Sequence, residues 1–122
     1  MERKLPGPST IQTGEAAEAL ACRYLEQQGL VLMERNYRCR TGEVDLIMRD
    51  GDCIVFVEVR SRHNSRYGTP AETITRTKQR RLCRAASYYL LTHHYNAPCR
   101  FDVIAILQQQ QLEWIRDAFQ AG

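Results

Sequence analysis

The sequence predicts an α/β fold in which a mixed β-sheet of about five strands is flanked by helices. Three observations support this class. Two apolar segments with alternating side chains, joined by an Asp-Gly pair, form a hairpin pattern at residues 43–60. A segment with a helical apolar stripe lies on either side of that hairpin along the chain. Two further strand patterns complete the order, which is helix, three strands, helix, two strands.

The chain before the hairpin contains a tail, a helix and a strand. We expect residues 1–12 to be a flexible tail, because they contain two prolines and show no periodicity. Thr13 can cap a helix that runs to about Gln28, where Gly29 ends it. The apolar stripe of this helix consists of Ala17, Leu20, Ala21, Tyr24 and Leu25. A strand is predicted over residues 30–38.

The hairpin follows a basic loop at residues 38–42. Asp50 and Gly51 are expected to form its two-residue turn, because glycine tolerates the positive φ that such a turn requires. A turn at this position sets the cross-strand pairs Met48–Cys53, Asp45–Phe56 and Glu43–Glu58.

Alternation along the two strands places their side chains on opposite faces. One face is apolar and consists of Val44, Leu46, Met48, Val55, Val57 and Val59. The other consists of Glu43, Asp45, Ile47, Ile54, Phe56, Glu58 and Arg60. Two carboxylates ~4 Å apart repel by roughly 4 kcal/mol at an effective dielectric near 20, so such a cluster needs a raised pKa, a cationic neighbour or a bound metal ion. The alternative is a solvated polar face, but Ile54 and Phe56 indicate that this face is covered.

A polar loop at residues 61–69 leads from the hairpin to a second helix, which begins at about Ala71 or Thr75 and ends at Thr92. Lys78 lies on the core-facing stripe of this helix, one turn before Leu82. Its amine therefore either extends to solvent or meets the acidic cluster. Strands at residues 100–107 and 111–115 follow. Residues 13–118 are thus expected to form one domain, and residues 119–122 a C-terminal tail.

The composition argues against several classes of protein. A chain of 122 residues is long enough for one domain with a core. We expect no membrane association, because no apolar run is long enough to span a bilayer and no signal-peptide pattern is present. Five widely spaced cysteines without a C-x-x-C pair argue against a disulfide framework and a zinc ribbon. Reduced thiols in a cytoplasmic protein are expected instead.

Positive charge is concentrated in the middle of the chain. The net charge is +3, but residues 35–84 contain twelve Arg or Lys and only six acids, three of which belong to the acidic face. Clustered arginine beside a small acidic site suggests a polyanionic partner that is handled through a metal ion. The alternative is an ordinary solvated surface.

Five short motifs occur in the order of a known family. They are Gly14-Glu15, the segment GEVDLI at 42–47, FVEVR at 56–60, KQRR at 78–81 and RFDV at 100–103. With these motifs the chain closely resembles the YraN family of small bacterial proteins over about residues 13–118. That family is similar in predicted fold to archaeal Holliday-junction resolvases and to the wider restriction-endonuclease-like superfamily. The resemblance implies a restriction-endonuclease-like core.

The resemblance also implies a catalytic set, which falls by position on Glu15, Asp45, Glu58 and Arg60. It implies that Asp45 and Glu58 bind one or two divalent cations, Mg²⁺ or Mn²⁺, with help from Glu15. Arg60 departs from the lysine that is usual in the superfamily. Arginine cannot give up its proton and act as a base, although it can orient a water molecule or stabilise phosphate charge. Lys78 can supply the missing amine.

Three functions are compatible with the sequence. The first is a metal-dependent nuclease that acts on structured or single-stranded DNA, the second is a nucleic-acid-binding module with weak or no cleavage, and the third is an assembly protein in which the acidic face is a structural ion network. In the first, backbone phosphates would be held by Arg38, Arg40, Arg62, Arg66, Arg80, Arg81 and Arg84. Related resolvases are dimers, and the sequence leaves a homodimer open.

Overall fold

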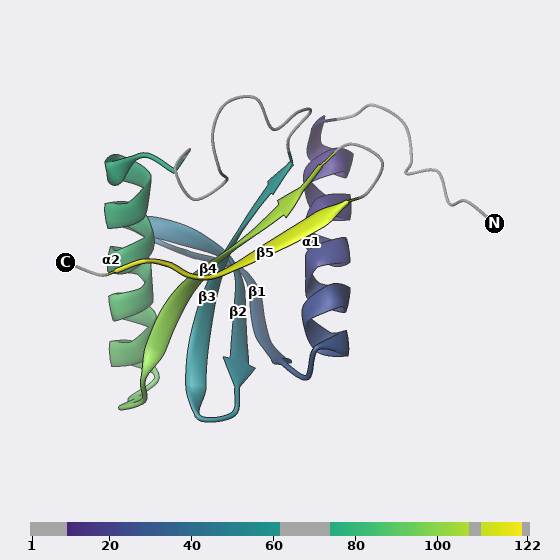
Figure 1. Cartoon of the computed structure of the whole chain (residues 1–122). Coiled ribbons are helices and arrows are strands. Elements are labelled where there is room, and N and C mark those ends of the chain that lie inside the picture. Colours follow the sequence, from purple (N-terminus) through teal and green to yellow (C-terminus); the bar gives the residue numbers. More distant parts are fainter. Residues whose placement is uncertain (1–9, 62–73, 108–110, 121–122) are drawn as a thin grey trace.

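One mixed β-sheet organises the chain (Figure 1). The computed structural model describes residues 10–61, 74–107 and 111–120. Its elements are α1 (Thr10–Gln27), β1 (Val31–Cys39), β2 (Gly42–Asp50), β3 (Cys53–Ser61), α2 (Arg76–Thr92), β4 (Cys99–Ile106) and β5 (Leu112–Phe119). The five strands lie in the order β1-β2-β3-β4-β5, and only the β3–β4 pair is parallel. The predicted α/β class with a mixed sheet and flanking helices is confirmed.

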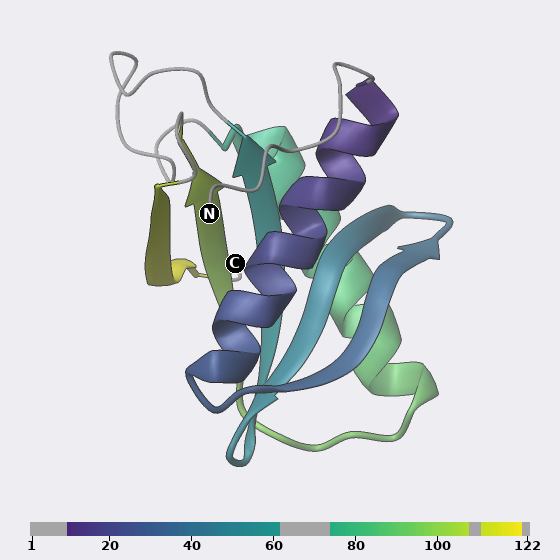
Figure 2. The ribbon, with the colours of Figure 1, turned by 90° about the vertical axis from the view of Figure 1, so that its right-hand side faces the viewer.

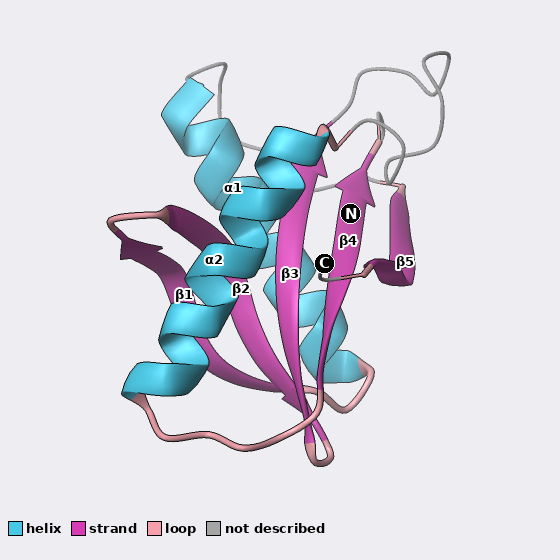
Figure 3. Cartoon of the chain, turned by 90° about the vertical axis from the view of Figure 1, so that its left-hand side faces the viewer, coloured by secondary structure: helices cyan, strands magenta, loops and turns pink. Residues whose placement is uncertain are grey.

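The two helices cover opposite faces of the sheet. Parallel strands require a long crossover connection, and α2 lies in the connection between β3 and β4. Figure 2 shows α1 in front of one face, and Figure 3 shows α2 in front of the other. Among the described residues, neither helix is long and apolar enough to cross a membrane.

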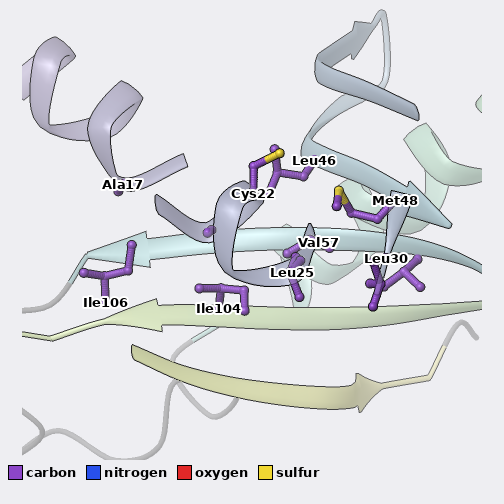
Figure 4. Packing of buried hydrophobic residues seen from close by; sticks show 11 residues of the cluster. Ala17, Cys22, Leu25, Leu30, Leu46, Met48, Val57, Ile104 and Ile106 are labelled. Atoms are coloured by element: carbon purple, nitrogen blue, oxygen red, sulfur yellow. The ribbon is translucent and has the colours of Figure 1, made fainter. Parts of the chain in front are cut away.

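Each helix buries its own set of apolar side chains against the sheet. The core under α1 includes Ala17, Cys22, Leu25, Leu46, Met48, Val57 and Ile104 (Figure 4). The core under α2 includes Tyr37, Val44, Ile47, Phe56, Leu82, Ala86, Tyr89 and Phe101. The hairpin face that carries Phe56 is therefore covered by α2, as its apolar members predicted.

The helix ends agree with their sequence signals at three of four positions. Gly29 has φ +98° and follows the end of α1, as predicted. Thr75 caps α2 by accepting a hydrogen bond from Lys78 N at 3.1 Å, and α2 ends at Thr92. The predicted start of α1 is wrong, because the helix begins at Thr10 and not after Thr13. No glycine or proline separates these two residues, so helical hydrogen bonding can continue through Thr13.

The predicted hairpin register is wrong by a shift of two positions in the partner strand. The structure pairs Asp50 with Cys53 and Ile47 with Phe56, so the turn consists of Gly51 and Asp52. Gly51, with φ +59°, takes the first position of the turn and not the second. The expected pairs Met48–Cys53, Asp45–Phe56 and Glu43–Glu58 are therefore not formed. The corrected register moves Asp45 towards Glu58.

The alternation of β2 also breaks at Asp45. Val44 packs under α2 with Ile47, whereas Leu46 packs under α1. The prediction that Val44 shares a face with Leu46 is thus wrong. In the neighbouring strand β1, Asn36 has φ +52°, and its sequence neighbours pair with Leu46 and Val44. Asparagine adopts this left-handed conformation more readily than most residues, so the irregularity lies beside Asp45 in both strands.

A buried carboxylate joins the last two strands. Asp102 on β4 is fully buried, and it accepts hydrogen bonds from Trp114 Nε1 at 2.9 Å and from Asp117 N at 2.9 Å. Arg100 Nε donates to both of its oxygens at 3.0 and 3.2 Å, while Arg100 Nη1 reaches Asp50 Oδ2 at 3.0 Å. Each hydrogen bond that the Asp102 carboxylate accepts compensates for the water that it loses on burial. This network holds β5 and the β2–β3 turn against β4.

Candidate functional site

The candidate site lies where β2 separates from β3. The ladder between the two strands ends at the Leu46–Val57 pair, and Figures 2 and 3 show the far end of the β1–β2 hairpin turning away from β3. Beyond that pair, the backbone N–H of Val59 donates to Asp45 Oδ2 at 2.8 Å. A side-chain carboxylate thus takes the place of the strand pairing.

Glu58 lies next to Asp45 and is one of two charged residues buried in the described part of the chain. Its Oε2 lies 3.3 Å from Lys78 Nζ. Lys78 projects from the start of α2 onto the sheet, so of the two alternatives for its amine the structure shows the contact with the acidic cluster.

Burial and charge raise the pKa of both carboxyls. Burial, and then the charge of Asp45, raise the pKa of Glu58 to about 7, while Lys78 opposes this rise. Burial also raises the pKa of Asp45, against the hydrogen bond from Val59 and the charge of Lys78. A hydrogen bond between the two carboxyls lowers the pKa of Asp45 and raises that of Glu58. This pattern fits a protonated Glu58 that donates to an ionised Asp45.

The helix acid that faces this pair is Glu18, which sequence analysis missed. Glu18 is half-buried, and burial followed by the charge of Asp45 raises its pKa. Asn36 and Arg35 on β1 oppose that rise through a hydrogen bond and a positive charge. One available signal was its spacing, because Glu18 lies four residues before the buried Cys22 on the same side of α1.

The structure places two of the predicted acids further from the pair. Glu15 is exposed one turn before Glu18, and its charge acts on Glu18. Glu43 is half-exposed and lies 3.5 Å from Arg38 Nε in a solvent-accessible ion pair. Such pairs contribute little to stability. The assignment of Glu15 as a metal ligand stays a prediction.

Arg60 follows Glu58 by two residues on β3 and is half-buried. Among residues 10–61, 74–107 and 111–120, it forms no ion pair with an acid. Its guanidinium charge is therefore not balanced by a carboxylate of the described chain. Its predicted catalytic role stays a prediction.

The described members of the predicted phosphate-binding set lie on the β1–β2 turn and on α2. Arg38 and Arg40 lie at the β1–β2 turn, and Arg80, Arg81 and Arg84 lie on α2, all exposed. The turn packs directly against the helix, because a Cβ on Gly42 would overlap the carbonyl oxygen of Arg81. Of the α2 arginines, Arg81 is thus the one whose backbone lies against the hairpin turn. Arg62 and Arg66, like His63 and Tyr67 of the same predicted loop, lie outside the described residues.

The donor set suits a hard divalent cation but is small. Within the described residues, no group of three His, Cys, Asp or Glu side chains is placed to hold a metal ion. Asp45 and Glu58 alone supply oxygen ligands of the type that Mg²⁺ and Mn²⁺ prefer. Their raised pKa values show that negative charge is disfavoured here, and a cation would relieve this. The residues therefore fit a cation that completes its coordination with water and substrate oxygens.

The chain has many relatives among known proteins. The sequence profile of the uncharacterised protein family UPF0102 matches residues 17–106. A UPF0102 protein of Nitrosomonas eutropha is 52% identical over 114 residues, which cover 93% of this chain and 98% of the relative. One of Cupriavidus metallidurans is 54% identical over 118 residues, covering 96% and 87%. One of Stutzerimonas stutzeri is 48% identical over 114 residues, covering 89% and 95%.

Proposed function

The chain belongs to the uncharacterised protein family UPF0102, and we propose that it is a divalent-metal-dependent endonuclease that hydrolyses phosphodiester bonds in structured or single-stranded DNA. YraN is the same family as UPF0102, so the motif resemblance and the profile lead to one family. The observation that carries the proposal is the pair of neighbouring carboxyls, Asp45 and Glu58, with the Lys78 amine 3.3 Å from Glu58. The expected similarity to restriction-endonuclease-like proteins adds to it.

Each polar group of the site has a task in this reaction. A bound Mg²⁺ or Mn²⁺ would supply Lewis-acid polarisation of the phosphodiester and an acidified water. Asp45, which the Val59 N–H holds in place, and Glu58 would provide its ligands. Because the pKa of Glu58 is about 7 without a cation, this carboxyl can give up its proton near neutral pH when a cation binds. Lys78 and Arg60 would balance the charge that develops on the phosphate.

The surface around the carboxyls favours a polyanionic substrate. Exposed Arg38 and Arg40 lie on the β1–β2 turn, which packs against the backbone of exposed Arg81 on α2. Arginines attract phosphates of any sequence, whereas sequence reading requires side chains that reach base edges. We therefore propose little sequence specificity.

A nucleic-acid-binding module with weak or no catalysis is the alternative, and one observation favours it. The Lys78 amine lies 3.3 Å from Glu58 Oε2 and so already occupies a position next to this carboxyl that a cation would require. Arginine at position 60 cannot replace a lysine base. In this alternative the same surface binds nucleic acid, but the protein does not cleave it when a metal ion is added.

The two functions are separated by a cleavage assay. Purified protein is incubated with branched and single-stranded DNA in Mg²⁺, in Mn²⁺ and in chelator, beside the variants Asp45→Asn and Glu58→Gln. The nuclease proposal expects cleavage that depends on the metal and falls by at least about 100-fold in Asp45→Asn, as for loss of a key electrostatic group. Binding without cleavage under all these conditions would support the alternative. Equal cleavage by wild type and Asp45→Asn would contradict the site.

A further inference from the structure

The side of α2 opposite Lys78 carries a pocket. Six residues line it, namely Arg76, Gln79, Arg80, Cys83, Arg84 and Gln120. Five of them lie on the first two and a half turns of α2, and Gln120 follows the end of β5. Figure 1 shows that end of the chain reaching α2. The pocket is therefore built from two elements and is not merely a charged helix face.

Three guanidinium groups in this pocket form no ion pair with an acid of the described residues. Arg76, Arg80 and Arg84 are spaced four residues apart, so they project from one side of the helix. Like charges at this spacing destabilise a helix, and the first turn of α2 contains no acidic residue. An anion in the pocket would relieve their mutual repulsion.

The remaining wall supplies neutral hydrogen-bonding groups in fixed positions. Gln79 Nε2 donates to Ile74 O at 3.0 Å. Gln120 Nε2 donates to the Asp117 carboxylate at 3.2 and 3.3 Å, and this exposed acid is not one of the residues that line the pocket. The pocket volume is about 200 Å³, far above the roughly 10–15 Å³ of the same measure that one water molecule needs, so a tetrahedral phosphate fits.

We propose that this pocket binds a phosphate group of a nucleic acid strand outside the carboxyl site. The inference rests on the nucleic-acid partner of the proposed function, but not on catalysis. A planar guanidinium group can bind two phosphate oxygens at once, and three arginines line this pocket. Lys78, on the opposite side of the same two turns, reaches Glu58. A helix with its side chains is ~10 Å across, so one strand that passes the start of α2 can reach both sites with different phosphates.

The test compares two variants that lose equal charge. Arg76→Gln/Arg84→Gln removes two arginines of the pocket, whereas Arg23→Gln/Arg49→Gln removes two exposed arginines of α1 and β2 that lie outside it. Fluorescence anisotropy with a labelled single-stranded oligonucleotide, in chelator so that no cleavage occurs, gives the affinity of each over a range of salt concentrations. Circular dichroism establishes that both variants are folded.

The proposal expects the pocket variant to bind at least about tenfold more weakly, and the slope of log affinity against log salt to fall by about 0.7 for each phosphate that the variant no longer neutralises. The control variant should stay within about twofold of wild type, because its arginines touch no phosphate. Equal weakening of the two variants, or no weakening of the pocket variant, would overturn the pocket. The nucleic-acid partner of the proposed function would then still stand.

A second arm distinguishes a strand from a small phosphate compound. Inorganic phosphate is titrated into wild-type protein while the side-chain amide resonances of Gln79 and Gln120 are followed by NMR. Shifts that disappear in Arg76→Gln/Arg84→Gln, together with the loss of oligonucleotide affinity, support the proposal. The same shifts with unchanged oligonucleotide affinity would overturn it in favour of a small phosphate ligand. If wild type binds no oligonucleotide even at low salt, the nucleic-acid partner itself fails.

Discussion

Replacing Glu58 by glutamine should remove a large part of the pH dependence of stability. The pKa of Glu58 in the folded protein is about 7, above the ordinary value of 4.5. A raised pKa means that the folded state binds a proton more tightly than the unfolded state does. The stability that this proton contributes is therefore complete at pH values below the pKa of Glu58 in the unfolded state, and it is lost as the pH rises through 7. The difference between about 7 and 4.5 corresponds to about 3 kcal/mol, at about 1.4 kcal/mol for each tenfold change in proton affinity.

The assay is urea unfolding in the presence of chelator, followed by the fluorescence of Trp114, the one tryptophan of the chain. Between about pH 4 and pH 8, the free energy of unfolding of wild type should fall by about 3 kcal/mol more than that of Glu58→Gln. Glu113→Gln, at an exposed position of β5, is the matched control and should keep the wild-type pH dependence. Parallel pH profiles of wild type and Glu58→Gln would refute the view that Glu58 is held protonated by burial and by Asp45.

Three further variants test the surroundings of the site. Lys78→Met keeps the side-chain stem but removes the charge that lowers the pKa of Glu58. NMR titration of the Glu58 carboxyl should therefore give a pKa above the wild-type value of about 7. An unchanged pKa would contradict the contact between Lys78 and Glu58. Asp102→Asn leaves Arg100 without its buried partner and should lower the free energy of unfolding by about 3 kcal/mol. A loss well below 1 kcal/mol in urea unfolding would show that the network is not needed. Gly42→Ala places a Cβ against the Arg81 carbonyl and should cost about 1–3 kcal/mol, whereas wild-type stability would contradict the close packing of the turn on α2.

The fold was predictable because most of its elements carry local signals. Gly29 ends α1, and Thr75 caps α2, through hydrogen bonds that involve only neighbouring residues. The apolar stripe of α2 likewise identified Leu82 and Tyr89 as core residues. Such signals depend on residues within a few positions of one another, and a single sequence contains them.

The hairpin register was not predictable from the same local signals. An Asp-Gly-Asp segment allows a two-residue turn at either of two positions, and the choice depends on how both strands pack between α1 and α2. The break in alternation at Asp45 depends on β1, where Asn36 adopts φ +52°. Sequence analysis thus correctly predicted that Asp45 and Glu58 belong to one cluster of carboxyls. It paired them across the strands with the wrong residues, Phe56 and Glu43.

Groups that depend on distant segments were also missed. Glu18 becomes part of the acidic site only because α1 packs beside β1 and β2. Asp102 was recognised within a motif, but its burial and its bonds to Trp114 and Asp117 depend on how β5 pairs with β4. The pocket at Arg76 requires the end of β5 to reach α2, which no spacing in the sequence indicates.

The most direct test of the carboxyl site is calorimetric titration of Mn²⁺ and Mg²⁺ near pH 7, in two buffers that differ in ionisation enthalpy. Because the pKa of Glu58 is about 7, cation binding should release about half a proton per site from wild type. The Asp45→Asn/Glu58→Gln double variant should neither bind the cation nor release protons. Cation binding that is unchanged in the double variant, or that releases no proton from wild type, would contradict the claim that these two carboxyls form the metal site.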